Sequence, residues 1–191
     1  YSDASASVSE VGTFQFEVDD NGYLGQTVSA VLSVDLGQFI PAYFDVTEAV
    51  TPTIESQCST FTYVGQPFDY AIGQEPTFTV TPYNGRGVVT QNYSGDQITL
   101  SPSTNQLAYT DNQNYAGGLS VPTSGSVSIS ANQSEGFDIS VLSSELAFDK
   151  ASSPSNPFTL DLDLTASAAF FTDADGVCYQ SNYPTSGCDS Y

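Results

Sequence analysis

The sequence predicts an all-β protein, an immunoglobulin-like β-sandwich with an additional N-terminal β-hairpin unit. Apolar and polar residues alternate along short segments from one end of the chain to the other, whereas helical periodicity is almost absent. Turns rich in Gly, Pro, Ser and Asn separate roughly nine or ten such segments, a spacing typical of sandwiches. The 191 residues are 39% apolar and include 12 Tyr and 12 Phe, which is enough to build a core.

A β-hairpin is expected over residues 13–36. Apolar residues alternate with polar ones over 14–18 and again over 28–36. Between the two runs lies Asp19-Asp20-Asn21-Gly22, in which Asn-Gly tolerates the positive φ of a tight turn. The sequence therefore predicts the turn at residues 19–22.

The remaining strands are expected downstream of this hairpin. The clearest alternates Leu160, Leu162 and Leu164 with Asp161 and Asp163, which predicts one buried face and one face of solvated carboxylates. A paired-carboxylate glycosidase site is the alternative interpretation of these two aspartates, although every alternating strand with a solvated face spaces them this way. The expected strands are 59–64, 76–82, 97–100, 106–110, 126–131, 137–142 and 158–166.

Two units are predicted from this strand pattern. Residues 1–47 form a strand or hairpin unit with too few strands to bury a core alone. Residues 48–191 form the sandwich, with a disulfide-closed C-terminal tail. The first unit is therefore expected to dock on its own sandwich or to be donated to a neighbouring copy as an added strand.

The charge balance excludes several classes of function. The chain has 22 acidic residues, one lysine (Lys150), one arginine (Arg86) and no histidine, for a formal net charge of −20. Binding of nucleic acid or anionic lipid needs clustered Lys and Arg, so neither partner is expected. The absence of histidine removes the usual general base, the Ser-His-Asp triad and the commonest zinc ligand. We therefore expect no enzyme, and no apolar run is long enough for membrane insertion.

Three cysteines indicate an oxidising, extracellular or cell-surface location. Cys178 and Cys188 are close enough in sequence to close a short loop, which leaves Cys58 unpaired or joined to another chain. A disulfide from Cys58 to either of the others is also open, because spacing does not fix connectivity.

Asn92 and Asn132 each begin an Asn-x-Ser triplet and are candidate glycosylation sites.

One short motif is a candidate metal site. Asp173-Ala174-Asp175-Gly176 resembles the start of a calcium loop, which predicts Ca²⁺ ligation by Asp173 and Asp175. The rest of an EF-hand is missing, and the alternative is a β-turn capped by a carboxylate. No other cofactor is expected.

Tyrosines are the candidate contacts for a glycan partner, because exposed aromatic rings suit adhesion. Tyrosine is also a good strand former that tolerates partial burial, so a structural role is the alternative. The tyrosines in question are Tyr63, Tyr70, Tyr83, Tyr93, Tyr109 and Tyr115.

Several blocks of sequence together carry a family resemblance. In order, they are 9–12 (SEVG) with 22–25 (GYLG), 37–46 (GQFIPAYFDV), 58–68 (which contains FTYVGQPF), 90–95 (TQNYSG) and 173–177 (DADGV). Their order and spacing, over most of residues 9–178, resembles the uncharacterised C-terminal region of the biogenesis protein Q family of the mannose-sensitive hemagglutinin (MSHA) pilus. Ala42-Tyr43 departs from that family, which has Asp-His there.

The resemblance implies a location on the bacterial surface rather than a chemistry. That region belongs to a much longer exported protein, which implies that this chain is a module, a processed piece or a shortened relative. We therefore expect a non-enzymatic module that builds or decorates a filament or pilus through contacts between the β structures of its subunits. Strand donation is one form that such a contact could take. Its partners would be other copies or other surface proteins. The alternative is an adhesin domain that binds a glycan or matrix component through exposed tyrosines.

Overall fold

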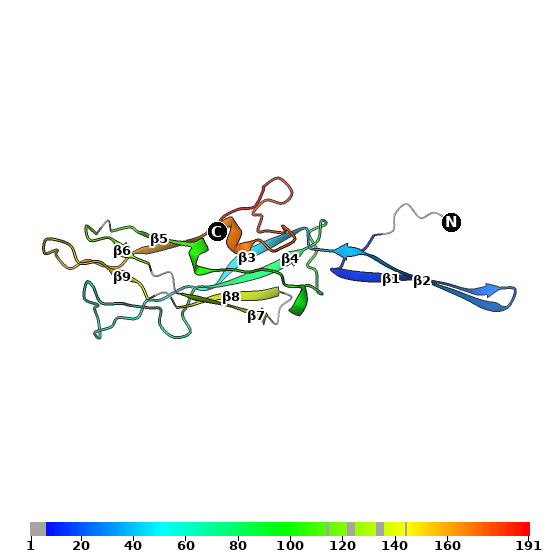
Figure 1. The fold of residues 1–191 in the computed structure, drawn as a ribbon, viewed down its shortest axis with the longest axis horizontal. Helices are drawn as coiled ribbons and strands as arrows, with labels where there is room; N and C mark the ends of the chain where they lie inside the picture. The colour runs from blue at the N-terminus through cyan, green and yellow to red at the C-terminus, as the bar shows by residue number, and fades with distance from the viewer. Residues whose placement is uncertain (1–6, 114, 122–124, 133–135, 144) are drawn as a thin grey trace.

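The fold is all-β, as the alternation predicts. The computed structural model describes residues 7–113, 115–121, 125–132, 136–143 and 145–191, with the backbone alone at 16–23, 26–34 and 143. Ten strands and three short 3₁₀ helices make up the regular structure of these residues. The molecule is elongated, with a two-stranded arm at one end and a body that holds the other strands (Figure 1).

The arm is an antiparallel hairpin, and its two strands pair with no other described strand. Strand β1 (Gly12–Tyr23) lies beside β2 (Gln26–Phe39), in a register that places Phe14 opposite Leu36. The predicted hairpin is thus confirmed, but it is longer than expected. Figure 1 shows both strands extending away from the body.

The predicted turn position is wrong. The chain reverses at Leu24-Gly25, where φ is 51° and 75°, the sign that a type I′ turn requires at both residues. Asn21-Gly22 instead lies within β1, where the register shifts between Asp20 and Tyr23. The long apolar alternation of β2 continues the ladder past the preferred turn sequence, so strand register overrides local turn preference.

The body is organised around a four-stranded antiparallel sheet of order β3-β4-β8-β7. Strands β4 and β8 are central, and the predictions at 76–82, 126–131 and 137–142 are confirmed. The sequence did not predict β3, and the expected unit boundary at residue 47 falls inside it. The bounds are β3 Tyr43–Val50, β4 Thr77–Tyr83, β7 Ser126–Asn132 and β8 Gly136–Ser143.

Two smaller sheets complete the body. Strand β5 (Leu107–Asp111) pairs with β10 (Leu162–Ala166), and β6 (Leu119–Ser120) pairs with β9 (Ala147–Phe148). In β10 the leucines are half-buried and Asp163 is exposed, as the alternation predicts. The 3₁₀ helices are η1 (Gly95–Gln97), η2 (Thr104–Gln106) and η3 (Ala168–Phe171).

Two expected strands are absent. Residues 97–100 join no ladder: Gly95 adopts a φ of 56° and starts the helical turn η1, which includes Gln97, and residues 98–100 follow it without pairing. Residues 59–64 form a loop whose one bridge joins Cys58 to Phe61. Ser59 has a φ of 59° in that loop, which is incompatible with an extended strand.

The buried residues form a main core and a second core. In the main core, alternate side chains of β3, β4 and β8 pack against non-strand segments that include η3. The second core is smaller and centres on Phe68, Leu146 and Phe148. The fully enclosed side chains of the main core include Phe44, Val80, Phe137, Ile139, Val141, Phe170 and Phe171.

The C-terminal tail closes over the main core. The predicted disulfide Cys178–Cys188 is confirmed, with a Cα–Cα distance of 5.5 Å, and Cys58 is a free cysteine. Phe44 N–H donates to the Cys178 carbonyl (2.9 Å), and Gln180 N–H donates to the Phe44 carbonyl (3.1 Å), which covers the outer edge of β3 there. Among the described residues, no helix is long and apolar enough to cross a membrane.

Candidate functional site

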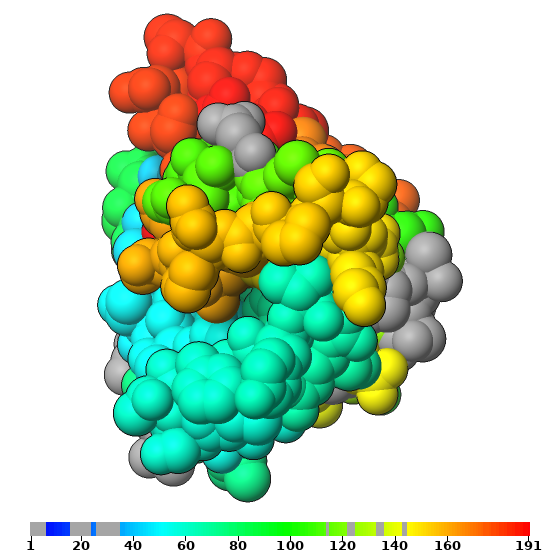
Figure 2. Space-filling model, turned by 90° about the vertical axis from the view of Figure 1, so that its left-hand side faces the viewer, coloured from blue at the N-terminus to red at the C-terminus, as the bar shows by residue number. Residues whose placement is uncertain are grey.

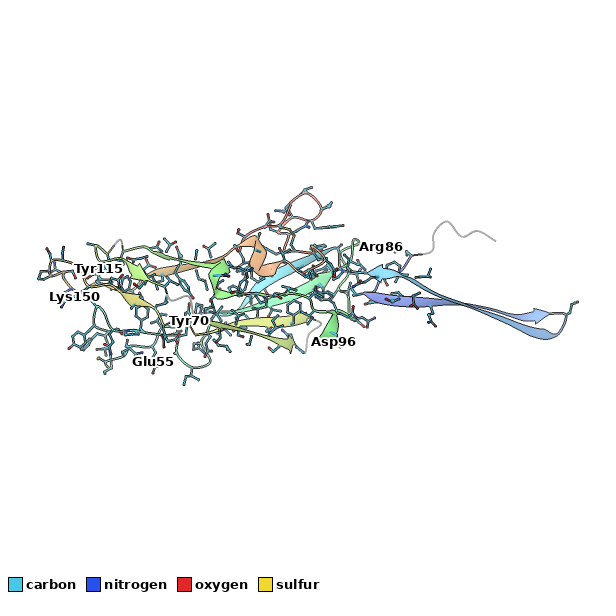
Figure 3. The ribbon with its side chains drawn as sticks, viewed as in Figure 1. Glu55, Tyr70, Arg86, Asp96, Tyr115 and Lys150 are labelled. Carbon is cyan, nitrogen blue, oxygen red and sulfur yellow. A yellow bond between two sulfur atoms is a disulfide. The ribbon has the colours of Figure 1, made fainter. Side chains whose placement is uncertain are left out.

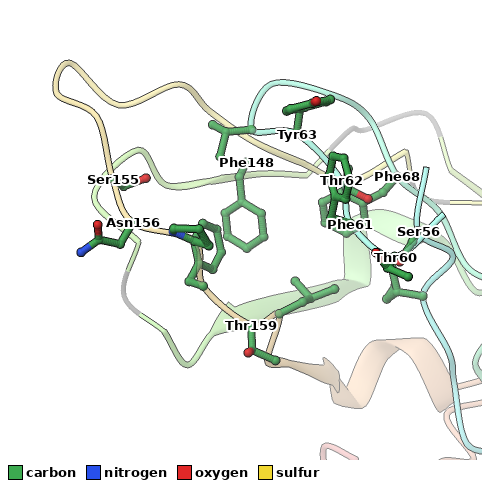
Figure 4. A pocket seen from close by; sticks show the side chains of 15 residues that line it. Ser56, Thr60, Phe61, Thr62, Tyr63, Phe68, Phe148, Ser155, Asn156 and Thr159 are labelled. Carbon is green, nitrogen blue, oxygen red and sulfur yellow. The ribbon is translucent and has the colours of Figure 1, made fainter. Parts of the chain in front are cut away.

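A cavity of about 770 Å³ lies at the end of the body opposite the arm. Figure 2 views this end directly and shows the hollow between the loop of residues 54–68 and the segment around residues 150–160. Phe148 points into the space between these segments (Figure 4). The lining residues are Ile54, Ser56, Thr60, Phe61, Thr62, Tyr63, Val64, Phe68, Phe148, Ser155, Asn156, Pro157, Phe158, Thr159 and Leu160.

Backbone bonds and stacked rings hold the cavity walls in place. Gly65 N–H donates to the Phe148 carbonyl (2.7 Å), and Phe68 N–H donates to the Leu146 carbonyl (2.8 Å), so the loop is joined to β9. On the other wall, Phe158 meets Phe148 edge to face, with the ring centroids 5.1 Å apart. The cavity thus lies over the second core, and backbone hydrogen bonds and ring contacts fix its walls.

The lining offers apolar rings and hydroxyl groups. Phe68 and Phe148 form part of the floor, whereas Phe61 and Tyr63 keep 50% and 64% of their surface exposed at the opening. Five of the lining residues are Ser or Thr, and none is charged. Such a surface suits an uncharged guest with an apolar part, since hydroxyls can bond its polar groups while the rings exclude water. It offers no general base and no ligand set for a metal.

The turn at residues 173–177 contains the carboxylate for which calcium was predicted. Asp173 is buried, and its Oδ1 accepts the N–H groups of Asp175 (3.0 Å) and Val177 (2.8 Å). The Tyr93 hydroxyl donates to Oδ2 (2.8 Å). Protein donors therefore occupy both carboxylate oxygens, which is the geometry of a carboxylate-capped turn.

The calcium site at Asp173 and Asp175 stays a prediction. Asp175 is exposed. Within the part of the chain that the structure describes, no group of three or more His, Cys, Asp or Glu side chains could hold a metal ion. A cation at Asp173 would have to compete with the Tyr93 hydroxyl and the two backbone donors, so metal binding would require this turn to open.

The structure assigns most of the candidate tyrosines to packing. Burial, and then the bond to Asp173, raises the pKa of Tyr93. The Tyr70 hydroxyl donates to the Tyr109 hydroxyl (2.9 Å) inside the body. Tyr115 stacks on Phe158, with the ring centroids 4.8 Å apart. Tyr83 is half-buried, so Tyr63, at the cavity opening, is the exposed member of the six.

The two candidate glycosylation asparagines differ in their surroundings. Asn92 is exposed and precedes the buried Tyr93, so its side chain is accessible from solvent. The Asn132 amide donates to Asp138 Oδ1 (2.9 Å), and Ser134 of its triplet lies outside the described residues. Glycosylation at both positions stays a prediction.

The arm is joined to the body at its root. Val11 is buried in the main core, and Gln91 N–H donates to Glu10 Oε2 (2.9 Å). Arg86 lies at this root and donates to Ser7 Oγ (3.1 Å) (Figure 3). At the other end of the arm, Leu24 keeps 86% of its surface exposed. The arm is thus fixed at one end and presents an apolar residue at the other.

A family model matches nearly the whole chain, including the arm and the residues that line the cavity. A family model described as DUF6701, third domain, matches residues 10–191. The chain belongs to this family. No curated protein and no solved structure matches this chain. Nothing in these comparisons links it to the MSHA biogenesis protein Q, so that resemblance stays a prediction.

Sequence reasoning missed the cavity of this DUF6701 domain. Its walls come from segments about a hundred residues apart, and no alternation or turn motif predicts that they meet. One signal was present, the three aromatic residues Phe61, Tyr63 and Phe68 within one short segment. A stack of Tyr83, Tyr43 and Tyr183 was also missed. Its ring centroids lie 5.2 Å and 4.3 Å apart, and it joins β3 and β4 to the disulfide loop.

Proposed function

We propose that this DUF6701 domain is a non-enzymatic extracellular module that builds or decorates a surface filament or pilus through contacts between β structures. The observation that carries the proposal is the arm, because β1 and β2 pair with each other and project from the body (Figure 1). A lone two-stranded ribbon is marginally stable in water. A neighbouring molecule that covers the arm would stabilise it in a way that the body of the same chain does not.

An open sheet edge supports strand donation as one form of this contact. Among the described strands, β7 pairs with β8 alone. Its sequence, SVSISAN, carries no charge and no proline, the devices that usually protect an edge from pairing. Another copy or a different surface protein could add a strand there through main-chain hydrogen bonds.

The proposed location rests on two further observations. The disulfide Cys178–Cys188 indicates an oxidising compartment. The family description, a third domain, favours a module that works beside other domains. We also propose that the body is an immunoglobulin-like sandwich, a fold widely used for extracellular modules.

Binding of a glycan or matrix component is the second candidate function, and the cavity favours it. Exposed Tyr63 and Phe61 beside Ser and Thr hydroxyls offer the stacking face and hydrogen bonds that a sugar needs. On a glycan array, the wild-type domain should then bind, and Tyr63→Ala should lose that binding. Ile72→Ser, changed at an exposed site outside the lining, is the matched control and should keep the binding.

Replacing the arm tests the assembly function. A short Gly-Ser linker in place of residues 13–38 keeps Val11 and β3, so the body retains its core. Sedimentation velocity at physiological salt should show oligomers for the full chain and monomers for this armless variant. Ile72→Ser is the matched control, because Ile72 is 93% exposed on the body and should be dispensable. Oligomers of unchanged size from the armless variant would contradict the proposed function.

A further inference from the structure

We propose that the tip of the arm, Leu24-Gly25, inserts into the cavity of a second copy and joins the copies head to tail. This inference rests on the proposed function, because it names the surface that receives the arm. The tip and the cavity lie at opposite ends of the elongated molecule, so they cannot meet within one chain (Figure 1). A contact between two different surfaces repeats without closing unless the rotation forms a ring, and open repetition produces a filament.

Leu24 is an unusual residue for the place it occupies. Its φ of 51° is a left-handed conformation that disfavours bulky side chains, and two-residue turns of this kind prefer Asn, Asp or Gly. Its side chain is 86% exposed, so no contact within the described structure offsets that strain. Asn21-Gly22, with the preferred turn sequence, lies only a few residues away. Strain of this kind persists where a residue has a functional contact to make.

The cavity has the chemistry to receive such a tip. Its floor of Phe68, Phe148 and neighbouring rings would cover a leucine side chain, and the loss of exposed apolar surface drives the contact. The Ser and Thr hydroxyls around the opening can bond the backbone groups of the turn. At about 770 Å³ the space exceeds one leucine side chain, so the tip backbone enters with it.

The distribution of charge also favours this pairing. Two copies with a net charge of −20 each repel one another, and their contact surfaces must avoid opposed carboxylates. Neither Leu24-Gly25 nor any residue that lines the cavity is charged. Lys150 lies at the cavity end, but Glu55 lies there too (Figure 3), so the pairing depends on uncharged contact surfaces rather than on attraction between opposite charges.

Complementary variants test the direction of the contact. Leu24→Asn removes the apolar tip and gives the turn a preferred residue, so the arm should be as stable as before or more so. Phe61→Glu places a charge at the cavity opening. In size-exclusion chromatography with light scattering, each variant alone should be monomeric, and a mixture should give one-to-one dimers, because one intact tip meets one intact cavity.

The outcomes separate this inference from the proposed function. Ile72→Ser, on an exposed site outside the lining, should assemble like wild type. Wild-type assembly by Leu24→Asn, with loss of assembly by the armless variant, would overturn the tip contact and leave the proposed function standing. Assembly by the armless variant would overturn both. Monomers in the variant mixture would also contradict head-to-tail insertion.

The free thiol of Cys58 provides a second, structural readout. Cys58 lies in the loop between the lining residues Ser56 and Thr60. A Leu24→Cys variant treated with a short bismaleimide should give dimers joined from residue 24 of one copy to Cys58 of the next, identified by peptide mass spectrometry. Adding Cys58→Ser should abolish that product. Crosslinks from residue 24 to residue 24 alone would show that arms meet arms and would overturn the proposal.

Discussion

The arm and the body use the same alternation of apolar and polar residues, yet they differ in what the alternation buries. In the body, β4 and β8 bury every second side chain against the main core. In the arm, β1 and β2 pair with each other and with no other described strand, and among the described side chains Phe14 has Phe39 as an aromatic neighbour, with ring centroids 5.6 Å apart. This difference is the reason for proposing that the arm makes its contacts with other molecules.

Core truncation should separate the two regions most clearly. Phe137→Ala empties a fully buried site of the main core and should lower the free energy of unfolding by about 3–5 kcal/mol. Phe14→Ala in the arm should cost less than about 1 kcal/mol in the monomer, because its site is only half-buried. Urea unfolding measures both losses. Equal losses would show that the arm is part of the cooperative core.

Loss of the disulfide should weaken the body and spare the arm. The bridge closes a loop over a sequence separation of 10, and replacing Cys178 and Cys188 by serine should cost about 2–3 kcal/mol. Urea unfolding should shift accordingly, while crosslinking from the arm should stay unchanged. Loss of the arm's contacts in this variant would mean that the tail also positions the arm.

The bond between Tyr93 and Asp173 should account for a smaller share of the body's stability. Tyr93→Phe leaves Asp173 Oδ2 without that donor and should cost about 1–2 kcal/mol in urea unfolding. The folded-state pKa of Tyr93 is raised, so its contribution is complete below the ordinary tyrosine pKa of about 10 and is lost as pH rises above it. Tyr93→Phe should therefore lose less stability than wild type between about pH 10 and 11. A steeper loss would contradict the assigned bond.

Salt should act on contacts between copies more than on the fold. Each chain carries a net charge of −20, and contacts between copies need screening by ions. Oligomers seen by light scattering should dissociate as salt falls from about 150 to 10 mM, where the screening length grows from about 8 to 30 Å. The melting temperature of the armless monomer should change less. Assembly that does not respond to salt would contradict this electrostatic account.

Calcium should have the smallest effect if Asp173 acts as a turn cap. The carboxylate already accepts bonds from Asp175, Val177 and Tyr93, so added Ca²⁺ should leave the melting temperature within about a degree of that in EDTA. Asp175→Asn, on the exposed member of the pair, is the matched control. A larger rise with calcium that Asp175→Asn removes would establish the predicted metal site.

Local sequence pattern predicted the parts of the molecule that depend on neighbouring residues. The strands β4, β7, β8 and β10 follow from alternation, and the disulfide from two nearby cysteines. The turn at Leu24-Gly25 could not be predicted, since the pairing of two long strands overrode the local preference for Asn21-Gly22. The cavity could not be predicted either, because its walls meet only through tertiary packing.

Hydrogen exchange of the full chain at low and high protein concentration tests the central claim most directly. In the dilute monomer, the outward-facing amides of the arm should exchange rapidly, while the amides of β4 and β8 should be protected at all concentrations. At concentrations where copies assemble, amides near Leu24 and in the cavity loop of residues 54–64 should gain protection together. Exchange in the arm that is the same in monomer and assembly would contradict the role assigned to it.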